Sequence, residues 1–523
     1  MLNIRKLPLS IQDFEDLRTN NCLYVDKTEY IYRLASMGKS YFLGRPRRFG
    51  KSLFLSTLKA YFLGKKELFD GLAIAGLEKD WIEYPVLYID FNVEGYTDLT
   101  SLYKALDKNL RRLEQQWGKD EADTTPASRL LGLIDRAYEK TGRKVVVLVD
   151  EYDKPLVNTL DNEDLNKSMR DTLKGFYGVL KSADANLRFV FLTGVTKFSK
   201  VSVFSDLNHL TDISLDNEFA GICGISETEI TQYFQPEIKA LAEENELSYE
   251  ETFADLKKHY DGYHFARKSE GMYNPFSLLN TFQKRYFKSY WFETGTPTFL
   301  VQILKKGNFE IPNLENNVHI DVDDIMNYKA EYYNPVPLLY QSGYLTIKRY
   351  SREFNEFILG FPNEEVKYGF LKELLPAYAP QYATTQKFSA VQFVTTLRAG
   401  DIDGFMNNMR AFYASISYDK MKNETKNEQY YQFIFYLLVT LMGQFVQTEV
   451  KTSAGRADAV IKTADTIYVF EFKMENNGTA EEALKQINSK GYLIPFSAGG
   501  RKLVTIGAEF SEKERGLSRW VKG

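Results

Sequence analysis

Cysteine and histidine are scarce in this chain. Its 523 residues include two cysteines, Cys22 and Cys223, and four histidines. Two cysteines exclude a disulfide framework and a cysteine-rich zinc site. The histidines form no spaced cluster, which argues against a histidine-based metal or acid–base site. So few thiols are typical of a reducing compartment, and we expect a cytoplasmic protein.

Long hydrophobic runs and a strong net charge are also missing. The longest apolar run, Phe433 to Met442, is too short to cross a bilayer. The first ten residues resemble neither a signal peptide nor a transit peptide, so we expect no membrane association. The formal net charge of −4 excludes a chain-wide basic field, and any nucleic-acid contact must come from local patches.

The composition is that of a globular protein with several domains. Hydrophobic residues make up 44% of the chain, which is enough for sizeable cores. Three parts differ in pattern: 1–222, 223–400 and 401–523. In the first, short apolar runs alternate with helical stretches, which predicts a parallel sheet covered by helices. The runs are Tyr41–Leu43, Val86–Ile89, Val145–Val149 and Phe189–Leu192.

The other two parts read differently. Residues 223–400 are mostly helical in pattern, with a winged-helix-like part as one option, and Ser226 with Glu229 predicts a capped helix start. One helical pattern, Gln392 to Tyr413, crosses into the last part. Strand-like runs and a helix then predict a small α/β domain there.

A candidate phosphate loop follows the first apolar run. Arg47, Arg48, Phe49, Gly50, Lys51 and Ser52 lead directly into a helix. Backbone N–H groups at a helix start bind anions, Lys51 adds a positive charge, and the Ser52 hydroxyl would hold Mg²⁺. The first glycine of the usual pattern is replaced by Arg45. The alternative is a capped core helix after a basic loop.

Two acids end the most apolar run. Asp150 would hold Mg²⁺, and Glu151 would act as the base that polarises the attacking water. The alternative is a strand that ends in solvated acids. Thr193, after a later strand, is either a γ-phosphate sensor or a simple cap. Lys197, Arg47 and Arg48 are candidate charge stabilisers, between which the sequence does not choose.

A second constellation lies near the C-terminus. If Ala464 and Asp465 form the tip of a two-residue hairpin, Asp458 falls opposite Glu471, and Lys473 shares the face of Glu471. Two carboxylates this close repel unless a cation bridges them. Asp458, Glu471 and Lys473 then suit metal-dependent phosphodiester hydrolysis. Glu428 is a third candidate carboxylate, and Gly455–Arg456, Gln486 and Tyr492 are candidate lining groups. The alternative is a surface hairpin with cross-strand charge pairs.

The first part of the chain resembles a known family. Arg45 to Ser52, Leu148 to Asp153 and Tyr260 to Tyr263 are similar to motifs of the AAA-ATPase-like family of bacterial proteins, as are Tyr24 to Thr28 and Tyr273 to Ser277. The resemblance implies a P-loop NTPase fold of the AAA/ASCE-like class with bound ATP and Mg²⁺. By position, Lys51 and Ser52 bind phosphate and metal, and Asp150 and Glu151 form the acidic strand-end motif.

Residues from about 410 to 510 resemble the PD-(D/E)XK nuclease domain that commonly follows that ATPase, which implies a restriction-endonuclease-like α/β domain. Asp458, Glu471 and Lys473 are its implied catalytic core, with Glu428 as a helix-borne helper. We therefore expect an ATP-dependent, Mg²⁺-dependent nuclease whose partner is nucleic acid, with DNA favoured and RNA as the alternative. The alternative is a regulatory ATPase with a C-terminal domain that only binds. Homo-oligomerisation stays open.

Overall fold

The computed structural model divides the chain into two compact units. The first comprises 1–309 with 314–366, and the second comprises 310–313 with 367–523. The boundaries expected from sequence, after 222 and after 400, stay predictions. The structure describes residues 6–92, 95–197, 210–294, 304, 314, 318–326, 334–378, 390–414, 428–443, 447–450, 457–497, 500–511, 513–514 and 516–523. None of the helices in these ranges is both long and apolar enough to cross a membrane.

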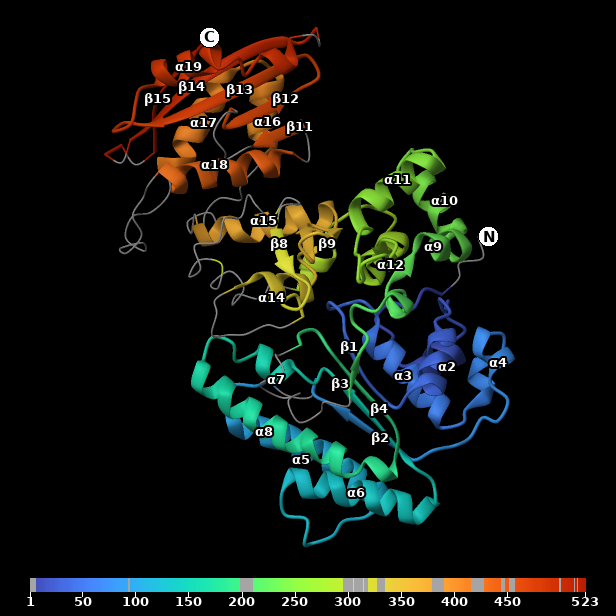
Figure 1. Ribbon diagram of the computed structural model, residues 1–523. Coiled ribbons are helices and arrows are strands. Elements are labelled where there is room, and N and C mark those ends of the chain that lie inside the picture. The colour runs from blue at the N-terminus through green and yellow to red at the C-terminus, as the bar shows by residue number, and fades with distance from the viewer. Residues whose placement is uncertain are drawn as a thin grey trace. The chain divides into compact units, whose positions relative to one another are not determined.

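A five-stranded parallel sheet in the order β2-β3-β4-β1-β5 forms the first unit's N-terminal part (Figure 1). Its strands are β1 (Ser40–Gly44), β2 (Val86–Asp90), β3 (Val145–Asp150), β4 (Leu187–Gly194) and β5 (Thr211–Asp212). All four apolar runs are therefore strands, as predicted. β1 and β3 are buried throughout, as in a sheet covered on both faces. Ligands bind at the carboxyl ends of such strands.

Helices connect the parallel strands. α3 (Lys51–Phe62) follows β1 directly, and α5 (Leu99–Trp117), α6 (Pro126–Thr141) and α8 (Glu163–Ser182) contact one another on the other side of the sheet (Figure 1). α5 and α6 both begin with a capping box, which satisfies free N–H groups of the first turn. The short helices are α1 (Phe14–Thr19), α2 (Thr28–Met37), α4 (Ala73–Leu77) and α7 (Lys154–Val157).

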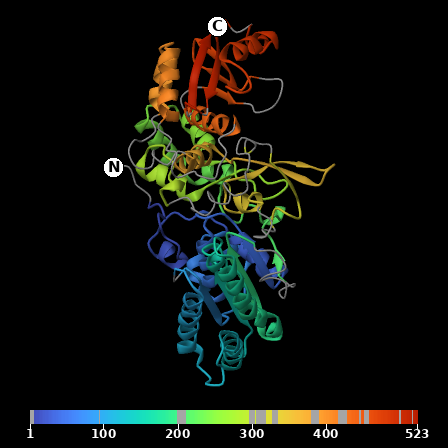
Figure 2. The ribbon, with the colours of Figure 1, turned by 90° about the vertical axis from the view of Figure 1, so that its left-hand side faces the viewer.

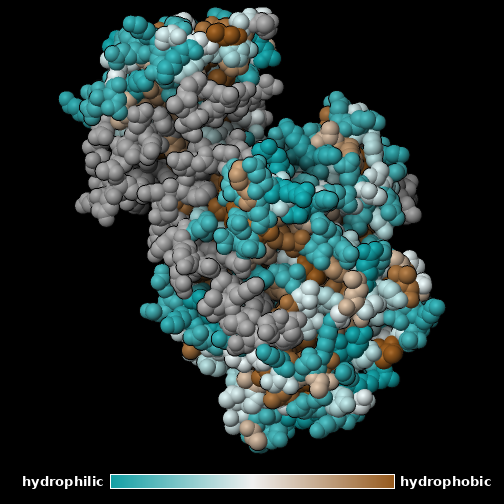
Figure 3. All heavy atoms as spheres, in the orientation of Figure 1, coloured by the Kyte–Doolittle hydropathy of each residue, from teal (hydrophilic) through white to brown (hydrophobic). Residues whose placement is uncertain are grey.

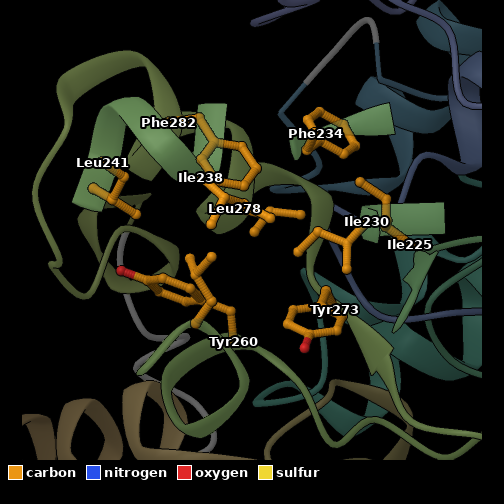
Figure 4. Close-up of a cluster of buried hydrophobic side chains, with 10 residues drawn as sticks. Ile225, Ile230, Phe234, Ile238, Leu241, Tyr260, Tyr273, Leu278 and Phe282 are labelled. Carbon is orange, nitrogen blue, oxygen red and sulfur yellow. The ribbon is translucent and has the colours of Figure 1, made fainter. Parts of the chain in front are cut away.

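A helical group with its own core follows. It contains α9 (Glu227–Tyr233), α10 (Gln235–Glu244), α11 (Tyr249–Tyr260) and α12 (Pro275–Lys284), with the strand pair β6 (Ile225–Ser226) and β7 (Met272–Tyr273). Figure 4 shows its buried side chains, among them Phe234, Tyr260 and Phe282, converging between these helices. Ser226 caps α9 in a capping box with Glu229, as predicted.

The last part of the first unit is a small antiparallel sheet in the order β8-β10-β9. β8 is Val318–Asp321, β9 is Thr346–Ser351 and β10 is Glu356–Gly360, and the β9–β10 hairpin projects outwards in Figure 2. α14 (Val336–Gln341) precedes β9 and is buried along its whole length. The winged-helix-like option for part of residues 223–400 stays a prediction.

On the face drawn in Figure 3, hydrophilic side chains predominate and hydrophobic residues form separate patches.

The second unit is a small α/β domain. α15 (Glu364–Tyr378) crosses from the first unit into it. Its sheet runs β11-β12-β13-β14-β15, with β13 and β14 parallel and the other pairs antiparallel. The strands are β11 (Gln447–Val450), β12 (Ala459–Lys462), β13 (Thr466–Met474), β14 (Lys502–Ser511) and β15 (Gly516–Lys522), and the helices are α16 (Ala390–Arg398), α17 (Ile402–Ala414), α18 (Glu428–Met442) and α19 (Ala480–Ser489).

The single helix expected from Gln392 to Tyr413 is wrong. The chain forms two helices there, α16 and α17, separated at Gly400. Gly400 has a φ of 71°, in the left-handed region that ends helices and favours glycine.

Candidate functional site

The loop between β1 and α3 is shaped to receive an anion. Gly50 is left-handed with a φ of 91°, and Arg48 with a φ of 69°, so the backbone turns sharply just before α3 begins. A Cβ atom on Gly50 would meet nothing within 4 Å, so the space in front of the helix start is open. The first N–H groups of a helix have no partner within it and carry its positive partial charge. The loop therefore offers a phosphate-binding surface.

Lys51 places a cation inside this loop. Its side chain is buried, and Nζ donates to the carbonyl oxygens of Arg45 and Pro46, each at 3.0 Å. Burial lowers the pKa of Lys51, while the carboxylates of Glu151 and Asp150 act in the opposite direction. The amine therefore lies within reach of both the loop and the acids, as a phosphate-binding lysine must.

Asp150 and Glu151 stand at the carboxyl end of β3. Asp150 is 4% exposed, and burial raises its pKa to about 6, with a hydrogen bond from the Ser52 side chain as the largest opposing effect. Glu151 is left-handed, with a φ of 50°, and its carboxylate lies 3.6 Å from Lys154 Nζ. The structure therefore brings Ser52, Lys51 and both acids together. Ser52 and Asp150 are the pair that fits Mg²⁺ beside a nucleotide.

Two further acids belong to this site. Asp90 ends β2 and is the register partner of Asp150 on the neighbouring strand. Asp153 is 2% exposed and accepts from the backbone N–H groups of Val195 and Thr196, at 3.0 and 2.6 Å, which ties the end of β3 to the end of β4. Asp90 could have been found, since it also follows an apolar run. Asp153 ends the motif that begins at Leu148, but its role was not visible in the sequence, because its partners lie 42 and 43 residues away.

The side chains of Phe49 and Thr193 are buried, so they do not take the nucleotide-binding roles expected of them. The Phe49 ring is buried edge-on to Tyr263 and Phe265, at 4.7 and 5.2 Å between centroids, so only its backbone can face a phosphate. Thr193 is fully buried, and its hydroxyl donates to the Leu43 carbonyl at 3.0 Å. Here the hydroxyl fastens β4 to β1.

The candidate charge stabilisers separate into two kinds. Arg47 and Arg48 are exposed at the loop, and the Arg48 guanidinium stacks on Phe276 at 4.6 Å. Lys197 instead pairs with Asp212 of β5. The two arginines are therefore better placed to meet an incoming phosphate than Lys197.

A mainly apolar cavity of about 90 Å³ opens beside the loop. Gly50, Leu53 and Phe54 form the wall on the side of α3. Most of the remaining lining comes from Leu23–Val25, Ile222–Ile225 and α12 through Pro275 and Leu279. Flat apolar groups fit such a site, with a few polar groups to set their orientation.

The second constellation lies on the β12–β13 hairpin. The observed register pairs Ala459 with Phe470 and Lys462 with Ile467, as predicted. The Thr463 N–H donates to the Thr466 carbonyl at 2.9 Å, which closes the two-residue turn at Ala464–Asp465. Asp458 stands one residue before β12, and its Oδ2 accepts from the Phe472 N–H at 2.8 Å. Its carboxylate is thereby held next to Glu471.

Glu471 is the most constrained carboxylate of this unit. It is 4% exposed, and burial, then the charge of Asp458, raises its pKa to about 7. Gln486 of α19 donates to its Oε1, while its Oε2 has no hydrogen-bond partner among the described residues. A buried carboxylate oxygen without a partner is costly, because desolvation is not offset. A cation bound between Glu471 and Asp458 would offset it.

Further residues surround the carboxylate pair of the hairpin. Lys473 is half-buried on the strand of Glu471, and its charge opposes the rise in the Glu471 pKa. Tyr492 OH lies 3.5 Å from Gln486 Nε2. Phe472 turns to the opposite face and packs edge-on against Phe435 of α18 at 4.5 Å, as the alternation predicted. Glu428 begins α18, but its side chain lies outside the described residues, as do Gly455 and Arg456.

α19 lies unusually close to the sheet where it presents Gln486. A Cβ atom on Gly507 of β14 would come within 2.1 Å of the Ala480 carbonyl oxygen and 2.5 Å of the Leu484 nitrogen. Gly507 is the register partner of Glu471 on the next strand. The missing side chain therefore lets the helix approach the sheet beside the carboxylate that it touches.

Among the described residues, each candidate site offers two protein oxygen donors to a metal. In the ranges that the structure covers, no three histidine, cysteine or carboxylate side chains gather as a metal site. Each site has two candidate oxygen donors, Ser52 with Asp150 and Asp458 with Glu471. Mg²⁺ keeps several waters and takes substrate phosphates as ligands, so two protein donors fit this ion.

Two family models match this chain, one in each of the regions that contain the candidate sites. Residues 8–204 match the family model for predicted AAA-ATPases, and residues 426–520 match that for the PD-(D/E)XK nuclease superfamily. An uncharacterized protein in the vnfD 5′ region of Azotobacter chroococcum mcd 1 is 38% identical over 523 residues, which cover 99% of this chain and 98% of the relative. The Aeropyrum pernix ORC2 structure, in ADPNP and ADP complexes, is 11% identical and covers 69% of this chain and 92% of that chain. The TM-score between the two structures is 0.24.

The matched ranges contain the two constellations. The first includes the phosphate loop and the acids of β3, and the second includes Asp458, Glu471 and Lys473. The fold expected from the sequence, an α/β chain with a P-loop sheet and a C-terminal domain of the nuclease superfamily, is confirmed. The chain belongs to the family of the Azotobacter protein and joins an AAA-like ATPase domain to a PD-(D/E)XK nuclease-superfamily domain.

Proposed function

We propose that this chain is an ATP-dependent nuclease that hydrolyses phosphodiester bonds in nucleic acid, DNA or RNA, with Mg²⁺. The buried Glu471 Oε2, without a partner among the described residues and next to Asp458, carries this proposal, because it is the arrangement that a bound cation would complete. With two cysteines in the chain, we place its activity in the cytoplasm. Homo-oligomerisation is compatible with this function.

In the ATPase unit each residue has a role set by its position. The backbone of Arg47 to Gly50 and the Lys51 amine bind the phosphates, and Ser52 and Asp150 would hold Mg²⁺, which neutralises phosphate charge. Glu151 would orient the attacking water and take its proton. The exposed Arg47 and Arg48 stabilise charge on the phosphates. The cavity beside Gly50 receives the base of ATP.

Filling this cavity should weaken ATP binding without harming the fold. Leu279 is a partly exposed lining residue. A Leu279→Trp variant places a large ring where the base would lie, and we expect at least about tenfold weaker ATP binding, or about 1.4 kcal/mol. Leu279→Met conserves side-chain volume and should bind nearly as well. Titration with a fluorescent ATP analogue measures both, and equal affinities would place the base elsewhere.

In the nuclease unit, Asp458 and Glu471 would hold Mg²⁺, which activates a water and stabilises the charge that develops on the phosphate. Lys473, on the same face, orients that water or offsets this charge. Gln486 keeps the Glu471 carboxylate in one orientation. Glu428 is proposed as a third carboxylate from the start of α18.

The pKa of Glu471 gives the site a defined pH dependence. A carboxyl must lose its proton to bind a metal, and burial raises the pKa of Glu471 to about 7. Below pH 7 the metal competes with that proton, so the affinity for Mn²⁺ should fall about tenfold per pH unit, and above pH 7 it should level off. Calorimetric Mn²⁺ titration of the full chain between pH 5.5 and 8 measures this. An affinity that stays constant below pH 7 would contradict it.

The charge balance supports a second candidate function. Residues 401–523 contain 16 Lys and Arg against 15 Asp and Glu, so this part has no basic bias toward nucleic acid. A regulatory ATPase whose C-terminal domain only binds a partner fits that balance. Incubation of the purified chain with single- and double-stranded DNA and RNA, with Mg²⁺ or Mn²⁺ and with or without ATP, separates the two. Cutting that depends on Glu471 supports the first, and ATP binding without any cutting supports the second.

A further inference from the structure

A buried carboxyl lies at the start of the helix that leaves the ATPase unit. Glu365 is in the first turn of α15 and is 2% exposed. Its Oε1 accepts from the Trp291 N–H at 3.0 Å and from the Ser277 hydroxyl at 2.9 Å. Its Oε2 has no partner among the described residues, and burial raises its pKa to about 7.

Both partners of Glu365 lead to the arginines of the phosphate loop. The Trp291 indole Nε1 lies 3.5 Å from the Arg47 carbonyl oxygen. Ser277 follows Phe276 in the first turn of α12, and the Arg48 guanidinium stacks on the Phe276 ring at 4.6 Å. The Glu365 carboxylate thus connects Trp291, which contacts Arg47, with the first turn of α12, which contacts Arg48.

A third contact joins this assembly to the same loop. Gly343 has a φ of 89°, and a Cβ atom there would lie 2.8 Å from the Pro46 Cβ. The next residue, Tyr344, packs edge-on against Trp291 with 5.0 Å between ring centroids. A shift of the loop would therefore reach Trp291 both directly and through Tyr344.

Stability alone does not account for a buried polar side chain at this position, because one of its two oxygens has no partner among the described residues. A buried polar group that lacks a partner lowers the stability of the fold, and such groups occur where a residue serves a function other than stability. The contacts of Glu365 indicate what this function is.

We infer that Glu365 is a positioning residue that couples phosphate binding at Arg47 and Arg48 to helix α15, through which the chain continues into the nuclease unit. The inference rests on the proposed function, because it requires ATP at the loop. The phosphates attract the two exposed arginines, and their supports, Trp291 and Phe276 with Ser277, move with them. Glu365 passes this movement to the first turn of α15. The order of α15 then differs between the chain with ATP at the loop and the chain without it.

Hydrogen–deuterium exchange of the full chain tests this at α15 itself. We expect ATP to change the exchange rate of peptides from residues 364–378 by threefold or more in the wild type. Glu365→Ala should bind ATP within about threefold of the wild-type affinity and lose this change. Glu365→Gln keeps the Oε1 acceptor and should retain this change, whereas Glu365→Leu keeps a side chain of similar size without the acceptor and should lose it. Glu364→Ala, one residue earlier in the same turn, is the matched control.

A second variant keeps the test decisive if Glu365→Ala does not fold. Trp291→Phe preserves an aromatic ring against Tyr344 but removes the indole donor to Arg47, and it should lose the ATP response of α15 as well. An undiminished response in Trp291→Phe or in a folded Glu365→Ala overturns the inference. If the wild type binds ATP and the exchange of α15 does not change, this inference is wrong and the proposed function still stands. If the wild type binds no ATP, both the proposed function and this inference are wrong.

Discussion

Glu471→Ala is expected to lower metal-dependent cutting about 1000-fold or more. The carboxylate would supply one of the two protein donors to Mg²⁺, and a metal contributes several kcal/mol to stabilising the charge of the transition state. A loss of about 4 kcal/mol corresponds to a factor of about 1000 in rate. The rate of cleavage of a labelled oligonucleotide under single-turnover conditions measures the effect. Removing a buried, incompletely satisfied carboxyl should at the same time leave the domain folded, or stabilise it.

The matched control is Glu475→Gln. Glu475 is exposed at the end of the same hairpin strand and bonds Ser511, away from Asp458 and Gln486. Its cutting rate should stay within about twofold of the wild type, since surface changes away from a site have small effects. If Glu471→Ala cut as fast as Glu475→Gln, the carboxylate pair would not be the catalytic centre, whatever its family resemblance.

Lys51→Ala is expected to weaken ATP binding about 100- to 1000-fold. The amine would give charge-assisted hydrogen bonds to the phosphates, each contributing about 1.5–3 kcal/mol, and losing about 3–4 kcal/mol in total accounts for that factor. Isothermal titration with ATP and Mg²⁺ gives the two dissociation constants. Cutting without ATP should be the same in this variant as in the wild type, because the nuclease residues are untouched.

Lys59→Ala controls for the loss of a lysine from the same helix. Lys59 lies two turns further along α3, with its amine over the Tyr88 ring at 5.4 Å. It should bind ATP like the wild type. If the two lysine variants bound ATP equally well, the phosphates would not lie at the start of α3.

Those parts of the fold that depend on local patterns could be predicted from the sequence. The apolar run from Val145 reads as a central strand because both its faces are buried. The pairing of the β12–β13 hairpin, which places Asp458 near Glu471, follows from a two-residue turn and the alternation of side chains. Both depend on residues within about 20 positions of one another.

The parts that were missed depend on residues far apart in the chain. Phe49 reads as part of the phosphate loop, but Tyr263 and Phe265, more than 200 residues later, draw its ring into a core. Glu365 looks like an ordinary acid of a first helical turn, since its partners Ser277 and Trp291 are 88 and 74 residues away. The break at Gly400 was visible as a single glycine, yet the apolar period continues across it. At these positions tertiary packing, and not the local sequence pattern, determines the structure.

The close approach of α19 at Gly507 has a consequence for how relatives of this chain should be judged. A single added methyl group there would push α19 away from the sheet and carry Gln486 off Glu471, while Asp458, Glu471 and Lys473 stayed in the sequence unchanged. Such a chain would pass every test of motif integrity and still have a disordered centre. Among relatives, a glycine at this position is therefore a better sign of an intact carboxylate site than the three motif residues by themselves.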